Sequence, residues 1–223
     1  MRGGEKVLLS LARLFPEAPI YTLLHVRGSV APELEARDIR TSFVQRLPAV
    51  ERRYRHYLPL FPTAAERFDL RGFDLVLSSS HCVAKGVRPG PGALHLCYCH
   101  TPMRYVWDRY DDYFHPDRLG LVERLVIPRV AARLRTWDAS SAERVDRFVA
   151  NSAYVAGRIR RYYDRDAEVI APPVDTGFFT RGADEPGTYD LIVSALAPYK
   201  RLELALEAYR GSGWPLRFVG TGP

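Results

Sequence analysis

Short apolar runs that end in small or polar residues recur along the chain and predict the strands of a parallel sheet. The predicted strands of the first part are residues 19–24, 73–80, 94–99, 147–150 and 167–170, with a strand or loop at 39–47. Longer stretches with a helical period occur at residues 6–15, 119–145 and 153–163, and helical pieces broken by prolines at 52–68. Strands that alternate with helices are typical of an α/β domain.

A proline-rich break divides this pattern. Residues 172–189 begin with two prolines and are interpreted as an irregular linker between a first domain, 1–171, and a second, 190–223. The second contains a predicted strand at 190–194, a helix at 201–209 and a strand at 216–219. Strand, helix and strand are only the beginning of a parallel βαβ domain, so we expect this second domain to be incomplete.

Composition narrows the protein class. The 223 residues are 47% hydrophobic, but no uninterrupted apolar stretch approaches the ~18 residues of a membrane span, and no signal peptide is visible. Three cysteines, Cys82, Cys97 and Cys99, argue against a secreted disulfide framework, so we predict a cytoplasmic protein.

The formal net charge of +6 comes almost entirely from arginine. It has two interpretations, a compositional bias of the genome or an anionic partner such as nucleotide phosphates or a membrane surface. Nucleic acid is not expected as a partner, because no finger, basic-zipper or RNA-binding spacing is present. Residues 46–61 mix arginines with aromatic and aliphatic residues, which fits equally a peripheral membrane surface or a solvated basic helix face.

His100 follows the apolar strand 94–99 and precedes Thr101 and Pro102, which predict the start of an aromatic helix with Pro102 at its first position. Ligands of open α/β sheets bind beyond the carboxyl ends of strands, so His100 is a candidate for proton handling or for binding a polar ligand. The alternative is a loop histidine bonded to backbone.

Two further segments suit phosphate or sugar oxygens. Gly3 and Gly4 precede a helix and expose backbone N–H groups there; the alternative is that they form only a tight turn. Glu5 either binds an acceptor hydroxyl or interacts favourably with the helix dipole. Lys200 and Arg201 lie where a strand turns into a helix, and their alternative is a solvated first turn. These segments and His100 together predict a two-lobed enzyme for phosphorylated, sugar-like substrates.

Metal binding is the weaker interpretation of two other groups. His81, Cys82, His95, Cys97, Cys99 and His100 could suggest zinc. The run from His95 to His100 lies along one strand and its end, however, whereas zinc sites use a turn between paired cysteines. Asp108, Asp111 and Asp112 could chelate Mg²⁺, but the aromatic residues between them favour a helix with one packed face. We therefore predict no metal site.

The chain resembles retaining glycosyltransferases of the GT4 type, most closely bacterial mannosyltransferase-like members. The resemblance rests on several short segments in the family's order: residues 3–7, 78–86, 97–105, 149–152, 172–175 and 198–201. It implies a GT-B fold of two Rossmann-like lobes, a nucleotide-sugar donor, retention at the anomeric carbon and no cofactor or essential metal. It also places His100 beside the donor sugar.

By this resemblance, residues 1–171 are an acceptor-side Rossmann-like lobe without its first strand, and residues 190–223 begin a donor-binding lobe. Lys200, Arg201, Gly220 and Gly222 would bind the donor, and Gly3, Gly4 and Glu5 would form an acceptor or phosphate loop. The half carrying a pair of donor-binding glutamates is missing, and Ala195 replaces a usual arginine. We therefore expect a fragment.

The predicted function is transfer of mannose from GDP-mannose, or of the sugar of a UDP-sugar, to a lipid-linked or saccharide acceptor in cell-surface polysaccharide synthesis. We expect it in the cytoplasm, peripherally at the inner face of the plasma membrane. The alternative is an inactive truncated lobe that acts as a binding module.

Overall fold

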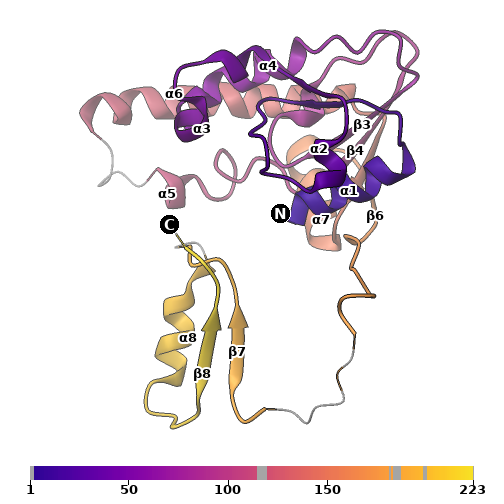
Figure 1. Cartoon of the computed structure of the whole chain (residues 1–223). Coiled ribbons are helices and arrows are strands. Elements are labelled where there is room, and N and C mark those ends of the chain that lie inside the picture. The colour runs from indigo at the N-terminus through magenta and orange to yellow at the C-terminus, as the bar shows by residue number, and fades with distance from the viewer. Residues whose placement is uncertain (1–2, 115–119, 181, 183–186, 198–199, 223) are drawn as a thin grey trace. The chain divides into compact units, whose positions relative to one another are not determined.

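A computed structural model describes residues 3–114, 120–180, 182, 187–197 and 200–222 (Figure 1). The chain forms two compact units, Met1–Pro173 and Val174–Pro223. Both are built from parallel strands and helices, which confirms the predicted α/β class.

The main sheet of the first unit has four parallel strands in the order β3 (Leu75–Ser80), β4 (Leu94–Cys99), β5 (Arg147–Ala150) and β6 (Ala167–Val169). A second parallel pair joins β1 (Ile20–Thr22) to β2 (Ile39–Thr41). Register places Ser79 opposite Tyr98 and Ser80 opposite Cys99. The carboxyl ends of β3, β4 and β5 therefore meet at one edge of the sheet.

Strand β4 shows why these residues form the centre of the sheet. Its side chains alternate, with His95, Cys97 and Cys99 buried. Cys97 and Cys99 pack in a cluster with Phe148 of β5 and with helix α7 (Ala153–Tyr163). The hydroxyl of Ser152 accepts a hydrogen bond from the Val155 amide and caps α7.

The other long helices are α1 (Gly3–Leu14) and α6 (Leu121–Ser140), which continues into the 3₁₀ turn η5 (Ser141–Arg144). Short helical elements make up most of the rest: α2 (Pro32–Glu35), η1 (Phe43–Arg46), α3 (Val50–Arg53), η2 (Tyr54–Leu60), α4 (Phe61–Glu66), η3 (Ala84–Gly86) and α5 (Tyr110–Tyr113). Pro59 lies inside η2 and Pro62 in the first turn of α4, which confirms the broken helical pieces.

The predicted aromatic helix after Thr101 is wrong. Residues 104–108 form turns, and only α5 is helical, so Pro102 does not occupy a first helical position. Tertiary contacts decide this conformation: Met103 and Val106 are buried in the core, and the Trp107 indole N–H donates to Asp138 Oδ2 at 2.8 Å. Local helix propensity does not outweigh such contacts.

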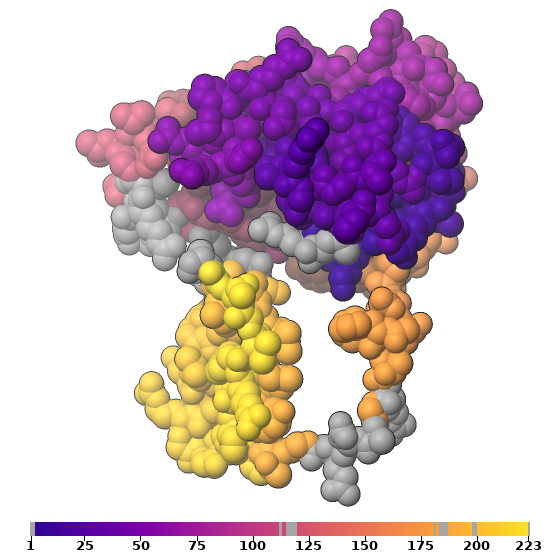
Figure 2. Space-filling view, viewed as in Figure 1, coloured from indigo at the N-terminus to yellow at the C-terminus, as the bar shows by residue number. Residues whose placement is uncertain are grey.

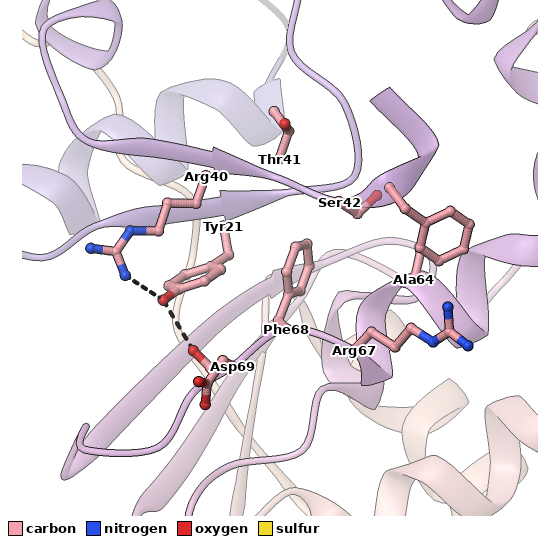
Figure 3. A pocket seen from close by; sticks show the side chains of 9 residues that line it. Tyr21, Arg40, Thr41, Ser42, Ala64, Arg67, Phe68 and Asp69 are labelled. Carbon is pink, nitrogen blue, oxygen red and sulfur yellow. Dashed lines mark hydrogen bonds between the residues drawn. The ribbon is translucent and has the colours of Figure 1, made fainter. Parts of the chain in front are cut away.

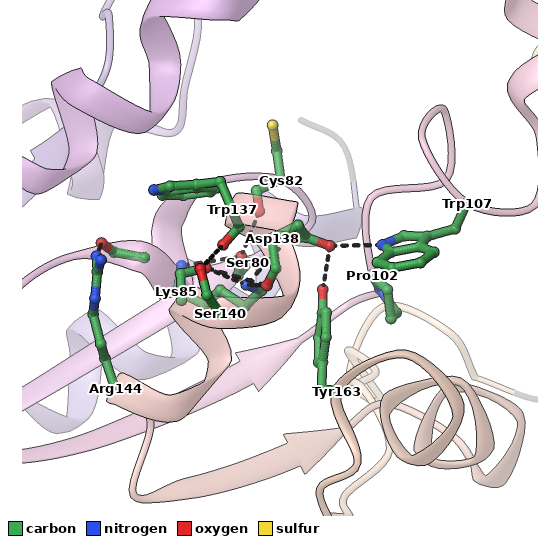
Figure 4. A network of polar contacts seen from close by, with 12 residues as sticks. Ser80, Cys82, Lys85, Pro102, Trp107, Trp137, Asp138, Ser140, Arg144 and Tyr163 are labelled. Atoms are coloured by element: carbon green, nitrogen blue, oxygen red, sulfur yellow. Dashed lines mark hydrogen bonds and ion pairs between the residues drawn. The ribbon is translucent and has the colours of Figure 1, made fainter. Parts of the chain in front are cut away.

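A buried polar network holds these elements together (Figure 4). Lys85 Nζ lies 3.1 Å from Asp138 Oδ1 and donates to Ser141 Oγ at 2.6 Å. Asp138 Oδ2 accepts hydrogen bonds from Trp107 and from the Tyr163 hydroxyl, the latter at 2.9 Å. The ion pair is 1% and 0% exposed, so each charge depends on the other for its stability in the interior.

The second unit is one βαβ motif. Strands β7 (Asp190–Val193) and β8 (Leu216–Val219) pair in parallel, and α8 (Leu202–Tyr209) connects them. No residue of α8 is buried, and Leu204 and Leu206 are at least half exposed.

Candidate active site

The carboxyl ends of β3, β4 and β5 hold His100 from several sides. Its backbone N–H donates to the Ser80 carbonyl at 2.8 Å, and its own carbonyl accepts from Asn151 Nδ2 at 3.0 Å. Ser80 ends β3, His100 follows β4 and Asn151 follows β5. The position of His100 is therefore fixed by both neighbouring strands.

The imidazole of His100 is half-buried beside one serine and one tyrosine side chain. Its Nε2 is hydrogen-bonded to Ser79 Oγ at 2.8 Å, and the ring meets Tyr98 edge-on with centroids 5.2 Å apart. Burial, and secondarily the nearby His81, lowers the pKa of His100 below its usual 6.5. The ring is neutral at pH 7, and the described residues provide no hydrogen-bond partner for its Nδ1.

The first turn of α1 lies against this ring. A Cβ atom on Gly4 would be 3.5 Å from His100 Nε2, whereas one on Gly3 would meet nothing within 4 Å. Gly3 and Gly4 thus belong to the helix itself rather than to a preceding loop, and Glu5 is in the same turn. Backbone N–H groups in a first helical turn have no partner within the helix and attract anions or sugar oxygens.

A buried cation supports the segment after His100, and no local sequence pattern predicts it. Arg158 of α7, which is 7% exposed, donates to Thr101 Oγ1 and pairs with Asp108. Tyr162, also on α7, donates to the same carboxylate and stacks on Trp107. Asp108 is therefore a structural partner of Arg158.

The predicted donor residues of the second unit lie at the start of α8 and after β8. Arg201 adopts the left-handed region, with φ 52°, at the N-cap of α8 and pairs with Glu203. Lys200 is exposed immediately before it, and Pro198 and Tyr199 of the same motif lie outside the described residues.

Gly220 and Gly222 are required by close backbone packing. A Cβ on Gly220 would lie 1.8 Å from the Ser194 carbonyl oxygen, and one on Gly222 would lie 2.7 Å from Leu196 Cβ. The Leu196 amide donates to the Thr221 carbonyl at 2.9 Å. The absence of side chains therefore lets the segments after β7 and β8 run side by side.

Among the described residues, no group of three or more His, Cys, Asp or Glu side chains is placed to hold a metal ion. His95 is bonded within the core, and Cys82 Sγ lies 2.7 Å from the Tyr105 hydroxyl. Burial raises the pKa of Cys82 to about 12, so this thiol is protonated at neutral pH. Asp111 is exposed, and the Asp112 side chain lies outside the description.

A pocket of about 340 Å³ opens beside β1 and α4 (Figure 3). Three of its polar residues are bonded to one another, since Arg40 donates to the Tyr21 hydroxyl and that hydroxyl donates to the Asp69 carbonyl. None of the predicted site residues lines it. The chemistry-bearing residues of the first unit are instead those around His100.

The basic stretch at residues 46–61 forms a solvated face. Val50 and Phe61 are buried, and Tyr54, Tyr57 and Leu58 pack against the same core. The arginines Arg46, Arg52, Arg53 and Arg55 are exposed. In the described part of the chain, no helix has the length and apolar character needed to cross a bilayer.

Comparison with known proteins adds one finding. The sequence model of the family described as Glycosyltransferase Family 4 matches residues 1–178, which include the whole first unit and all residues around His100. No curated protein gives a significant match to the chain.

Proposed function

Because the chain belongs to glycosyltransferase family 4, we propose that it transfers mannose from GDP-mannose, with retention, to a lipid-linked or saccharide acceptor of a cell-surface polysaccharide. Sugar transfer in general, from a nucleotide-sugar to an acceptor, follows from the family. The particular sugar, acceptor, pathway and stereochemistry are the content of the proposal, as is peripheral attachment to the inner face of the plasma membrane.

One observation carries the proposal: the neutral His100 ring lies at the carboxyl ends of the strands and against the first turn of α1. The Nδ1 of this ring, for which the described residues provide no partner, is suited to hold a sugar hydroxyl or to stabilise positive charge that develops at the anomeric carbon. The N–H groups of the α1 turn, with Gly3, Gly4 and Glu5, are suited to an acceptor hydroxyl or phosphate oxygen.

The proposed reaction is a front-face displacement. The bond between the anomeric carbon and the donor phosphate oxygen breaks, and the acceptor oxygen bonds to the same face of that carbon. The acceptor proton passes to the leaving diphosphate, which needs positive charge or N–H donors nearby. Lys200 and Arg201, with the backbone at Gly220 and Gly222, are the proposed donor-binding residues.

The proposal is tested by incubating the protein with GDP-mannose or a UDP-sugar and a lipid extract or saccharide acceptors. We expect mannose transfer from GDP-mannose and, by NMR of the product, the same anomeric configuration as in the donor. Transfer only from a UDP-sugar contradicts the donor assignment, and an inverted product contradicts retention. Acceptor binding with neither donor hydrolysis nor transfer favours the binding-module alternative.

A further inference from the structure

Helix α6 exposes aliphatic side chains on the face that points away from the core. Its inward residues, Ala131, Leu134 and Asp138, are buried, and Ile127 lies on the same side one turn earlier. Its first two turns expose four aliphatic residues, with exposed fractions of 82% to 49% from first to last: Leu121, Val122, Leu125 and Val126. The start of α6, drawn in pink, projects at the rim of the first unit (Figures 1 and 2).

Helical spacing gathers these four residues on one face. Leu121 and Leu125 are four residues apart, as are Val122 and Val126, so the two pairs form adjacent rows. The row of Leu121 and Leu125 continues into Arg129 and Arg133, which are both exposed. Arg129 donates to the Leu125 carbonyl at 2.6 Å, so its guanidinium lies beside the aliphatic patch.

The outward face is therefore amphipathic along the helix axis, with an aliphatic half followed by a cationic half. A contiguous exposed apolar patch rimmed by polar groups marks an interaction surface. Glu123, the acidic residue of the first turn, accepts the Gly120 amide at 2.9 Å as part of the helix cap, so its carboxylate is engaged at the helix end.

The size of the exposed patch and the charges beside it indicate which partner it fits. Two helical turns present far less than the ~800 Å² that each partner buries in a standard protein interface, so a second copy of the chain would be held weakly. Aliphatic side chains beside arginines match instead the acyl boundary and the phosphate headgroups of an anionic bilayer, because guanidinium groups bind phosphate oxygens and are weakly hydrated.

We propose that the outward face of α6 docks the first unit on an anionic lipid bilayer, with Leu121, Val122, Leu125 and Val126 in the acyl boundary and Arg129 and Arg133 at the headgroups. This inference deepens the proposed membrane attachment and rests on an acceptor that resides in lipid. The solvated arginines of residues 46–61 contribute mainly long-range attraction, since Val50, Phe61 and most of the apolar residues between them pack against the core.

Flotation of the full chain with vesicles of phosphatidylcholine and about one-third phosphatidylglycerol tests the proposal without any sugar substrate. Replacing Leu121 and Leu125 with Gln is expected to weaken vesicle binding by roughly tenfold or more. The matched control replaces Leu204 and Leu206, exposed leucines of α8, with Gln and leaves binding unchanged. Arg129→Gln with Arg133→Gln lowers binding to anionic vesicles and reduces its dependence on salt.

Unchanged flotation of the Leu121 and Leu125 variant, or equal loss in the α8 control, overturns the docking surface. Concentration-dependent dimerisation that the α6 variant abolishes, without vesicle binding by the original chain, also overturns it and assigns the patch to a second copy. Because the assay measures lipid binding alone, vesicle binding without sugar transfer identifies a failure of the proposed function and not of this surface.

Discussion

One histidine lies at the start of strand β4 and another directly after its end, and both bond to a serine of β3. His95 Nε2 lies 2.9 Å from Ser78 Oγ, and His100 Nε2 lies 2.8 Å from Ser79 Oγ. His95 is completely buried, and its Nδ1 lies 2.9 Å from the Arg144 carbonyl oxygen. His100 lies beyond the strand, half-buried, beside the first turn of α1.

The difference shows that residue type and a serine neighbour do not identify a functional histidine. Both ring nitrogens of His95 are satisfied by the protein, so nothing remains for a substrate. His100 uses one ring nitrogen and is at the strand end, where ligands of α/β sheets bind. Like His95, the residues Lys85 and Asp138 are buried and bonded to other protein groups, so we expect them to stabilise the fold.

Among the substitutions considered, removal of the buried Lys85 cation should change the free energy of unfolding most. Lys85→Met leaves Asp138 as an unpaired buried charge and is expected to lower the free energy of unfolding by about 3–5 kcal/mol. The measurement is denaturant unfolding followed by circular dichroism. The control double variant, Lys85→Met with Asp138→Leu, removes both charges and should lose less. A larger loss in the double variant would mean that Asp138 is stabilised by its other partners.

The two serines give a smaller and directly matched test. Ser78→Ala leaves a nitrogen of the buried His95 without a partner and is expected to cost about 1–3 kcal/mol of stability. Ser79→Ala should cost about 1 kcal/mol or less, because the half-buried His100 is accessible to water. Equal losses in thermal or denaturant unfolding would contradict the assignment of the two histidines to different environments.

The smallest effect is on the pH dependence of stability. Burial lowers the pKa values of both His95 and His100 below 6.5, so the unfolded chain binds more protons than the folded one as pH falls through that value. The free energy of unfolding should therefore fall below about pH 6.5. His95→Gln should flatten this dependence. A profile that the substitution leaves unchanged would remove His95 as one of its sources.

How far the sequence predicts this structure depends on whether a feature is local. The strands at 94–99, 147–150 and 216–219 are predicted with their observed bounds, because apolar runs and their flanking residues are local signals. The helix expected after Thr101 is replaced by turns, because Trp107 is held by Asp138 from another helix. No local signal reports such a contact.

In the candidate site, too, features with a local sequence signal are predicted, and features that depend on contacts between distant residues are not. His100 is predicted at a strand end, and the structure places it there. Its contact with Gly4 joins residues that are far apart in the chain, and the support of Thr101 by Arg158 comes from α7. The outward aliphatic residues of α6 are visible in the sequence, but their exposure depends on which helix face the core covers.

We expect His100 to act in sugar transfer and His95 to act in folding. To separate the two roles, the transfer rate from GDP-mannose and the thermal unfolding midpoint are measured for both His100→Ala and His95→Ala. We expect His100→Ala to lower kcat by roughly 10²–10³-fold with a nearly unchanged midpoint, because transition-state stabilisation is lost. His95→Ala should lower the midpoint by several degrees, roughly 2–4 °C per kcal/mol lost in a domain of this size, with little change in kcat. Unchanged transfer by His100→Ala, or equal effects of both substitutions on both quantities, would contradict the claim.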